Sequence, residues 1–293
     1  MISVVIPAKN EANAIGEVVR KVIESIPDAE VIVVSDHSDD ATVTEAGAAG
    51  ARVIEHPYSK GNGAAIKTGA RAAVGDILVF LDGDGQHDPA DIPRLLKKLD
   101  DGYDMVVGAR RAGSQASLGR GLANALYNRL ASYMTGHRVE DLTSGFRAVR
   151  ARQFREFLYL LPNGFSYPTT STMAFFRAGY AVAYEPIDAS ARVGKSHIKL
   201  LRDGTRFLLI IFKVGTLYSP LKLFGPVALA LFLLGGGWYV HTFFSEGRFT
   251  NMSALLLTGS VMVFLMGLIS EQITALMYRE PEAASVDRVV RDD

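Results

Sequence analysis

Cysteine is absent from the 293 residues of this chain. Its absence excludes a disulfide framework, a thiolate nucleophile and a zinc site built on cysteine. An excess of charge is also missing, because 31 Lys and Arg residues balance 31 Asp and Glu residues. Nothing in the overall charge favours nucleic acid, so no such partner is expected. The first residues lack the charged region and long apolar run of a secretory signal, and none is expected there.

Long apolar runs occur only in the last third of the chain. Residues 221–244 and 253–278 are almost wholly apolar, and Glu271 is the one acidic residue within them. Each run reaches the ~20 residues that cross the ~30 Å hydrocarbon core of a bilayer. A buried helical hairpin of a soluble protein is the alternative. Two such runs joined by a short polar loop favour two transmembrane helices instead.

Basic residues flank and interrupt an apolar stretch just before these runs. This pattern predicts an interfacial amphipathic helix over residues 201–220. By the positive-inside rule, the large N-terminal part and the polar tail at 279–293 would face the cytoplasm.

Apolar strand patterns and helical patterns alternate over the first part of the chain. Short apolar runs predict strands over residues 2–7, 30–35, 52–55, 76–81 and 104–107. Between them, the spacing of apolar residues predicts helices over 12–25, 41–49, 61–74 and 89–98. This alternation predicts a mostly parallel sheet with helices on both faces. In such sheets ligands bind at the carboxyl ends of the strands.

The fourth predicted strand ends in two aspartates that are two residues apart. Glycines at 83 and 85 let the backbone turn, so the carboxylates of Asp82 and Asp84 can converge. Oxygen ligands in this place suit Mg²⁺ or Mn²⁺ carrying a diphosphate. A simple polar turn is the alternative, and the two aspartates alone do not decide between the two interpretations.

Polar residues also follow the first two predicted strands. They are Pro7-Ala8-Lys9-Asn10-Glu11 and Ser35-Asp36-His37-Ser38-Asp39-Asp40. These side chains could contact a nucleotide, or they could cap the helices that follow. The turn Ser59-Lys60-Gly61-Asn62-Gly63 could approach a phosphate closely, although it is not a Walker A sequence.

The order of these motifs resembles the family 2 glycosyltransferases of the GT-A fold, and more narrowly the polyprenyl-phosphate (dolichyl-phosphate) glycosyltransferases. Further matching motifs are Gly108-Ala109-Arg110, the segment Asp141-Leu142-Thr143-Ser144-Gly145-Phe146-Arg147, and Arg192-Val193-Gly194-Lys195-Ser196. The resemblance implies an α/β, Rossmann-like GT-A domain over residues 1–200, with a mostly parallel sheet covered on both faces. The interfacial helix at 201–220, a transmembrane hairpin at 221–278 and the tail at 279–293 would follow.

The activity implied by the resemblance is an inverting, metal-dependent transfer of one hexose, such as mannose or glucose. The donor would be a UDP- or GDP-linked sugar and the acceptor a polyprenyl (dolichyl or undecaprenyl) phosphate. The metal would be Mg²⁺ or Mn²⁺. The protein would be an integral membrane enzyme with a cytoplasmic catalytic domain. The sequence leaves open the sugar, the base, the polyprenol, the formation of a homo-oligomer and the role of Glu271.

Individual site residues also follow from the resemblance. The donor-binding set is Pro7, Ala8, Asn10, Glu11, Asp36, Lys60, Gly61, Asp82, Ser144, Arg192 and Lys195. The acceptor-phosphate set is Arg110, Arg120, Asn124 and Arg147. The metal ligands are Asp84 and Gln86, and the catalytic residues are Asp84, Arg110 and Asp141. The family's D-D-G-S-x-D has Ser35 for its first aspartate and His37 for its glycine, which puts the base contacts in question.

Three other functions stay open at this stage. A processive polysaccharide synthase carries a Q-x-x-R-W string, whereas the one tryptophan here, Trp238, lies inside an apolar run. A nucleotidyltransferase would share the fold, but its G-x-G-x-R signature is missing. A non-catalytic, membrane-anchored scaffold that binds nucleotide sugars would be expected to lose Asp84 or Arg110, and both are present.

Overall fold

The computed structural model describes residues 1–111, 118–164, 166–188, 212 and 215–278. For residues 118–124 it describes the backbone alone. The chain divides into two units, Met1–Ile198 and Lys199–Asp293. Most of the interfacial helix expected at 201–220 and the whole tail at 279–293 lie outside the described residues. The bounds of the four segments expected from the sequence therefore stay predictions.

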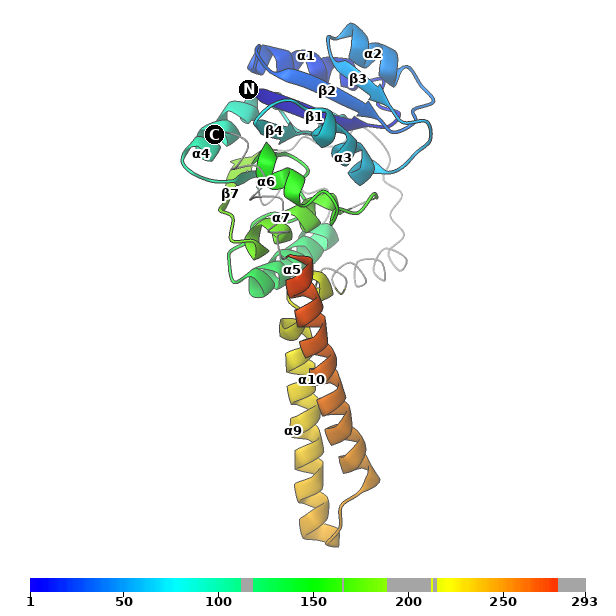
Figure 1. Cartoon of the computed structure of the whole chain (residues 1–293), viewed down its shortest axis with the longest axis vertical. Helices are drawn as coiled ribbons and strands as arrows, with labels where there is room; N and C mark the ends of the chain where they lie inside the picture. Colours follow the sequence, from blue (N-terminus) through cyan, green and yellow to red (C-terminus); the bar gives the residue numbers. More distant parts are fainter. Residues whose placement is uncertain (112–117, 165, 189–211, 213–214, 279–293) are drawn as a thin grey trace, which may run out of the picture. The chain divides into compact units, whose positions relative to one another are not determined.

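A 7-stranded sheet lies at the centre of the N-terminal unit (Figure 1). Its strands, in chain order, are β1 (Ile2–Ala8), β2 (Glu30–Ser35), β3 (Arg52–Glu55), β4 (Ile77–Phe80), β5 (Met105–Arg110), β6 (Arg147–Arg150) and β7 (Val182–Ile187). In space they follow the order β3-β2-β1-β4-β6-β5-β7. Strand β6 is antiparallel to both β4 and β5, and the other neighbouring pairs are parallel. The predicted mostly parallel sheet is confirmed, and each predicted strand coincides with one of β1 to β5.

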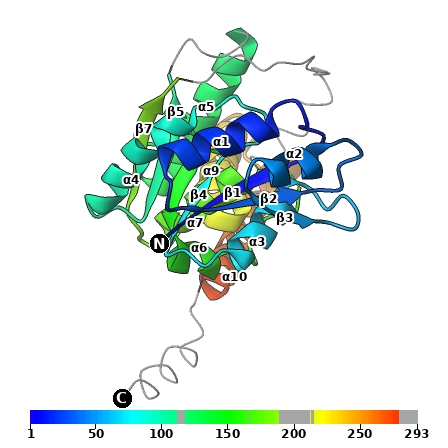
Figure 2. The same cartoon turned by 90° about the horizontal axis from the view of Figure 1, so that it is seen from above.

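Helices cover both faces of the sheet, as the sequence predicts (Figure 2). One face packs against α1 (Ile15–Ser25), α2 (Thr42–Ala48) and α4 (Ile92–Asp100). The other packs against α3 (Asn62–Ala72), α6 (Ala151–Glu156) and α7 (Tyr167–Arg177). Side chains alternate along β1, so Val4 and Ile6 join the first core while Val5 lies under α3. The remaining described helices of this unit are a short 3₁₀ turn, η1 (Pro89–Asp91), and α5 (Leu118–Thr135).

Gly69 lets α3 approach the sheet closely. A Cβ atom at this position would lie 2.2 Å from Cγ1 of Val5 and 3.3 Å from Cγ2 of Val34. Both valines are fully buried, so neither can move away into solvent. This close contact packs α3 against β1 and β2. It therefore fixes the position of the first turn of α3 relative to the ends of those strands.

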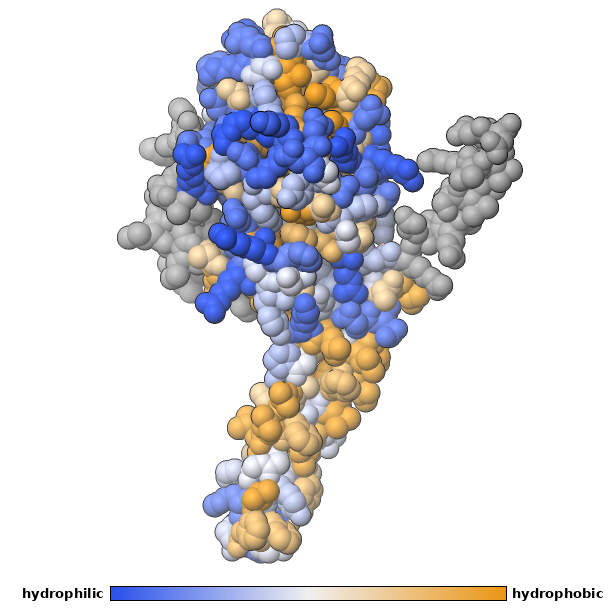
Figure 3. Space-filling view, turned by 90° about the vertical axis from the view of Figure 1, so that its left-hand side faces the viewer, coloured by the Kyte–Doolittle hydropathy of each residue, from blue (hydrophilic) through white to orange (hydrophobic). Residues whose placement is uncertain are grey.

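The C-terminal unit contains two helices that are long and apolar enough to cross a membrane, α9 (Pro220–Glu246) and α10 (Asn251–Met277). Their surface is mostly apolar (Figure 3). Within the most apolar stretch of each helix, only 11% of the residues of α9 and 17% of those of α10 are buried. The residues that are buried are mainly small and recur about every second turn: Ala228, Gly235 and Thr242 on α9, and Ser253, Ser260, Gly267 and Thr274 on α10. Small residues let two helices pack closely in lipid, where burial of apolar surface does not drive association.

Glu271 contacts the start of the neighbouring helix. Its Oε2 accepts a hydrogen bond from the backbone N–H of Leu221 at 3.3 Å, in the first turn of α9. The first N–H groups of a helix have no partner within the helix and carry partial positive charge. The carboxylate therefore caps α9 from the adjacent helix, which gives this residue a structural role that the sequence left open.

Gly69→Ala is expected to lower the free energy of unfolding by about 1–3 kcal/mol, because an added methyl group in a closely packed contact forces the backbone to shift. Gly47→Ala in α2 is the matched control, since its Cβ would meet only Cγ2 of Val53, at 4.0 Å. This substitution should stabilise the protein by about 0.5–1 kcal/mol through helix propensity. Denaturant unfolding of the full chain in detergent measures both changes, and equal effects would contradict the close approach of α3.

Candidate functional site

A pocket of about 450 Å³ lies at the carboxyl ends of β1, β2 and β4. Neighbouring parallel strands bring the loops that follow them to one edge of the sheet, where ligands bind in this type of fold. The pocket is lined by Pro7, Ala8, Lys9, Glu11, Asp36, Ser59, Gly61, Asn62, Ala65, Asp82, Gly83 and Asp84. The structure thus brings together most of the residues that the sequence assigned to the donor.

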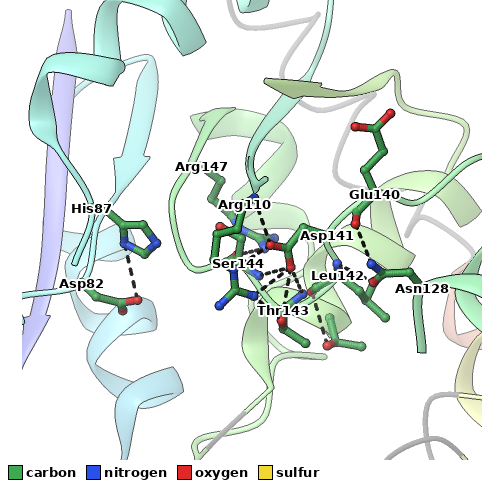
Figure 4. Close-up of polar contacts among 11 residues, drawn as sticks. Asp82, His87, Arg110, Asn128, Glu140, Asp141, Leu142, Thr143, Ser144 and Arg147 are labelled. Carbon is green, nitrogen blue, oxygen red and sulfur yellow. Dashed lines mark hydrogen bonds and ion pairs between the residues drawn. The ribbon is translucent and has the colours of Figure 1, made fainter. Parts of the chain in front are cut away.

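Asp82 and Asp84 line this pocket from the turn after β4. Oδ1 of Asp84 accepts a hydrogen bond from the backbone N–H of Gln86 at 3.2 Å, and the Gln86 side-chain amide contacts Oδ2. The Asp82 side chain is 33% exposed, and its Oδ2 lies 4.0 Å from Nδ1 of the buried His87 (Figure 4). Partial burial raises the pKa of Asp82; His87 opposes this rise and the Asp84 carboxylate adds to it.

Asp84 and Gln86 offer oxygen donors of the kind that a hard divalent cation binds. In the described part of the chain, no three His, Asp or Glu side chains gather into a ligand set of their own. Magnesium commonly takes one or two carboxylates from the protein, and phosphate oxygens and waters complete its shell. This donor set therefore fits Mg²⁺ or Mn²⁺ shared with a bound diphosphate.

Asp36, at the carboxyl end of β2, is held by four hydrogen bonds. Its Oδ1 lies 2.9 Å from Nδ1 of His56 and accepts from the Lys60 N–H at 2.7 Å. Its Oδ2 accepts from Oγ of Ser59 and the N–H of Gly61, both at 2.8 Å. Burial alone would raise the pKa of Asp36, but these hydrogen bonds outweigh it and lower the pKa to about 2. The carboxylate thus fastens the turn before α3 to the end of β2.

The glycine-rich turn binds another segment of the chain. The N–H of Gly63 donates to the carbonyl oxygen of Gly164 at 3.1 Å, and that of Ala64 donates to Asn163 at 2.8 Å. These N–H groups stand at the start of α3, where the sequence suggested close approach to a phosphate. In the structure their hydrogen bonds go to backbone carbonyls, so they serve packing and not an anion.

Arg110, the last residue of β5, and Asp141 form a second charged group (Figure 4). Nε and Nη2 of Arg110 lie 2.7 and 2.9 Å from the two carboxylate oxygens, and Nη2 also donates to Oγ1 of Thr143. Burial would raise the pKa of Asp141, but the Arg110 guanidinium outweighs it and lowers the pKa. Nη1 of Arg110 has no hydrogen-bond partner among the described residues, so its two N–H groups can serve an anion.

Arg147 lies inside the fold. It is 0% exposed, its Nη1 donates to the carbonyl of Pro168 at 3.0 Å and to Oγ of Ser171 at 2.8 Å, and its Nη2 donates to the carbonyl of Ser144. Since no atom of Arg147 reaches the surface, the expectation that it contacts the acceptor phosphate is wrong. Its guanidinium instead ties the segment before β6 to α7.

The remaining expected residues are placed in different ways. Asn10, with a φ of 55°, accepts a hydrogen bond from the Asp39 N–H at 2.9 Å, and Lys60 lies over the ring of Tyr58 at 5.4 Å. Neither Asn10 nor Lys60 lines the pocket. Only the backbone is described for Arg120 and Asn124 on α5, and Arg192 and Lys195 lie outside the described residues.

Sequence reasoning missed several residues around the pocket. His56 is 3% exposed and joins Asp36 to Oγ1 of Thr68, which lies 2.9 Å from its Nε2. His56 directly follows β3, and this position at a strand end was the one feature of the sequence that could have placed it near the pocket. Ser59 and Asn62 line the pocket together with Gly61, whereas Lys60 does not, so the glycine-rich turn indicated the right place and one of the two residues assigned from it.

Comparisons with known proteins place these features in context. Residues 3–158 match the family described as Glycosyl transferase family 2, and residues 219–276 match the GtrB C-terminal hairpin. A dolichyl-phosphate hexose transferase of Haloferax volcanii is 33% identical over 73% of this chain and 93% of the relative. An undecaprenyl-phosphate 4-deoxy-4-formamido-L-arabinose transferase of Pseudomonas aeruginosa is 29% identical over 99% of this chain and 91% of the relative.

A solved structure has a similar fold. It is glucosyl-3-phosphoglycerate synthase from Mycobacterium tuberculosis, in complex with Mn²⁺, UDP-glucose and phosphoglyceric acid. The match has a TM-score of 0.58 and 27% identity over 72% of this chain and 77% of that chain.

The lowered pKa of Asp36 predicts a pH-dependent contribution to stability. Ionised Asp36 stabilises the folded state above its unfolded pKa of 3.8, and this contribution is lost as the pH falls through the folded value of about 2. Its size is about 2 kcal/mol, from a shift of nearly two pKa units. The difference in unfolding free energy between the unmodified chain and Asp36→Asn should therefore be largest near neutral pH and shrink between about pH 4 and about pH 2.

Urea titrations across this pH range measure the difference. Asp101→Asn, at an exposed position, is the control and should change the free energy by less than about 0.5 kcal/mol throughout. A difference for Asp36→Asn that stays constant down to about pH 2 would show that the carboxylate is not held by these hydrogen bonds.

Proposed function

The chain belongs to glycosyltransferase family 2, and from this premise we propose that it transfers one hexose from a nucleotide sugar to a polyprenyl phosphate. The observation that carries the proposal is the Asp82–Asp84 pair in the pocket at the strand ends. The relatives named for dolichyl-phosphate and undecaprenyl-phosphate transfer support the acceptor class. The neighbour solved with Mn²⁺ and UDP-glucose supports the donor class.

The pocket would hold the nucleotide sugar. Asp82 would contact the ribose and diphosphate, while Asp84 and Gln86 would hold Mg²⁺ or Mn²⁺. Once bound, that cation would offset the charge of the departing nucleoside diphosphate. Asp36 would act mainly through the turn that it fastens, because both of its oxygens already accept hydrogen bonds. Whether the base belongs to UDP or GDP stays open.

Arg110 would bind the phosphate of the acceptor. Asp141 and Thr143 hold its guanidinium in one orientation, and Nη1 is left to donate to a phosphate oxygen. That oxygen is already an anionic nucleophile, so the protein needs no strong general base, and its main task is positioning. Attack on the anomeric carbon opposite the leaving diphosphate would invert its configuration and give a β-linked product from an α-linked donor.

The α9–α10 hairpin would anchor the protein in a membrane, with the N-terminal unit on the cytoplasmic side. Each helix has 27 residues, which exceeds the ~20 needed to cross the hydrocarbon core. A membrane anchor suits an acceptor whose polyprenyl chain lies in lipid.

The family resemblance also assigns roles to four residues that the structure does not test. Arg120 and Asn124 would contact the acceptor phosphate, and Arg192 and Lys195 would contact the donor.

The purified full chain in detergent can be tested with one radiolabelled UDP- or GDP-hexose at a time, together with Mn²⁺ and a polyprenyl phosphate. Label should enter the solvent-extractable lipid fraction with one class of donor, and only when the lipid phosphate is present. Label that entered a polymer would favour a processive synthase. Failure of every donor to label the lipid would contradict the proposal.

Asp84→Ala is expected to reduce transfer at least about a thousandfold, because a cation at this site would contribute several kcal/mol of charge stabilisation. Addition of a chelator should reduce transfer by the unmodified chain in the same way. Thermal unfolding should show that the variant is folded. Asp101→Ala, at an exposed position, is the control, and retained turnover in Asp84→Ala would refute the metal assignment.

Arg110→Lys keeps the charge but removes the planar fork that pairs with Asp141. Loss of a charged hydrogen bond should lower kcat/KM for the lipid phosphate about tenfold. The KM for the nucleotide sugar should change less than about twofold, because Arg110 does not line the donor pocket. Arg111→Lys, whose side chain is 59% exposed, is the control. A change confined to the donor KM would assign Arg110 to the donor site instead.

A further inference from the structure

We propose that Gly145 is a positioning residue of the donor site, which sets where the carboxylate of Asp82 lies. This inference rests on the proposed function, since it takes Asp82 as a donor contact. A Cβ atom at Gly145 would lie 2.8 Å from Oδ2 and 3.2 Å from Oδ1 of Asp82. Real Cβ atoms essentially never come as close as the first of these distances, so any side chain at Gly145 would displace the carboxylate.

The requirement for glycine comes from this contact and not from the backbone conformation. Gly145 is not among the glycines with positive φ, so an alanine could adopt its backbone angles. The position follows from the sheet. In the antiparallel pair β4–β6, Phe80 lies opposite Arg147 and Val79 opposite Ala148. Continuing this register by two residues beyond Phe80 places Asp82 opposite Gly145.

The backbone at Gly145 is fixed from its other side. Its carbonyl oxygen accepts a hydrogen bond from the hydroxyl of Tyr167 at 3.1 Å, and the carbonyl of Ser144 accepts from Nη2 of Arg147. Tyr167 is 2% exposed and Arg147 is 0% exposed. The Tyr167 ring also packs edge-on against Phe80, with ring centroids 6.3 Å apart. The segment that meets Asp82 is therefore held to β4, the strand that precedes Asp82.

Hydrogen bonds do not fix the Asp82 carboxylate. Nδ1 of His87 lies 4.0 Å from Oδ2 of Asp82, which is beyond hydrogen-bond distance. No other hydrogen bond reaches its oxygens among the described residues. Packing against Gly145 thus limits where the carboxylate can lie while its oxygens stay available to a donor. A displaced carboxylate would keep the pocket but lose the contact with the nucleotide.

A double-mutant cycle tests the coupling of Gly145 and Asp82. The probes are UDP and GDP, each with Mn²⁺, and their binding to the full chain in detergent is measured by calorimetry. Gly145→Ala should weaken binding about tenfold when Asp82 is present, as expected for residues in contact. In the Asp82→Ala background the same substitution should change binding less than about twofold, because the displaced group is absent.

Two further variants keep the test decisive. Gly47→Ala is the matched control, because Gly47 does not line the pocket and a Cβ there meets only Cγ2 of Val53, at 4.0 Å, so it should leave binding unchanged. Tyr167→Phe keeps the ring and deletes only the hydroxyl that holds Gly145, so it should weaken binding about threefold, again only when Asp82 is present. This variant tests the same coupling if Gly145→Ala fails to fold.

The cycle separates this inference from the proposed function. An equal loss of binding in both Asp82 backgrounds, or no loss in Gly145→Ala, would overturn the positioning role while the proposed function stands. Absence of binding of either nucleotide by the unmodified chain would overturn the proposed function and this inference with it.

Discussion

The site depends on the antiparallel pairing of β6 with β4 and β5. A parallel strand in this place would deliver its preceding residues to the opposite edge of the sheet. Because β6 runs the other way, the segment before it lies at the carboxyl ends of its neighbours, where Phe80 and Val107 both pair with Arg147. That segment carries Asp141 and Gly145, so one reversed strand brings Asp82 after β4 and Arg110 at the end of β5 into a common site.

A buried cation holds this arrangement in place. Transfer of an arginine from water to a protein interior costs several kcal/mol unless its charge and its hydrogen bonds are satisfied. Neutral groups offset part of that cost, namely the carbonyls of Ser144 and Pro168 and the hydroxyls of Ser171 and Thr172, which accept from Nη1 and Nη2. The buried Nε has no hydrogen-bond partner among the described residues. These bonds unite β6, the segment before it and α7. Because the carbonyls of Ser144 and Gly145 are held by Arg147 and Tyr167, Gly145 can contact the Asp82 carboxylate with its backbone and without a side chain.

Much of the fold could be predicted because its signals are local. Continuous apolar runs such as Val31–Val34 mark β1, β2 and β4, and the polar residues that follow them mark the edge at which the pocket forms. Strands β6 and β7 carry no such signal: β6 begins and ends with arginine, and β7 contains Pro186. The role of Arg147 was misjudged for the same reason, since a basic residue in a motif resembles a surface ligand until its strand is known to be central. His56 was missed because its partner Asp36 lies 20 residues away in the sequence.

The central claim is that the phosphate of a lipid attacks a sugar held at the Asp82–Asp84 pair, directly and in one displacement. The anomeric configuration of the purified lipid product, read from the coupling of its anomeric proton in an NMR spectrum, tests this claim most directly. From an α-linked nucleotide sugar, the account predicts a β-linked sugar joined to the lipid through a single phosphate. An α-linked product, or a sugar joined to the lipid through a diphosphate, would contradict it.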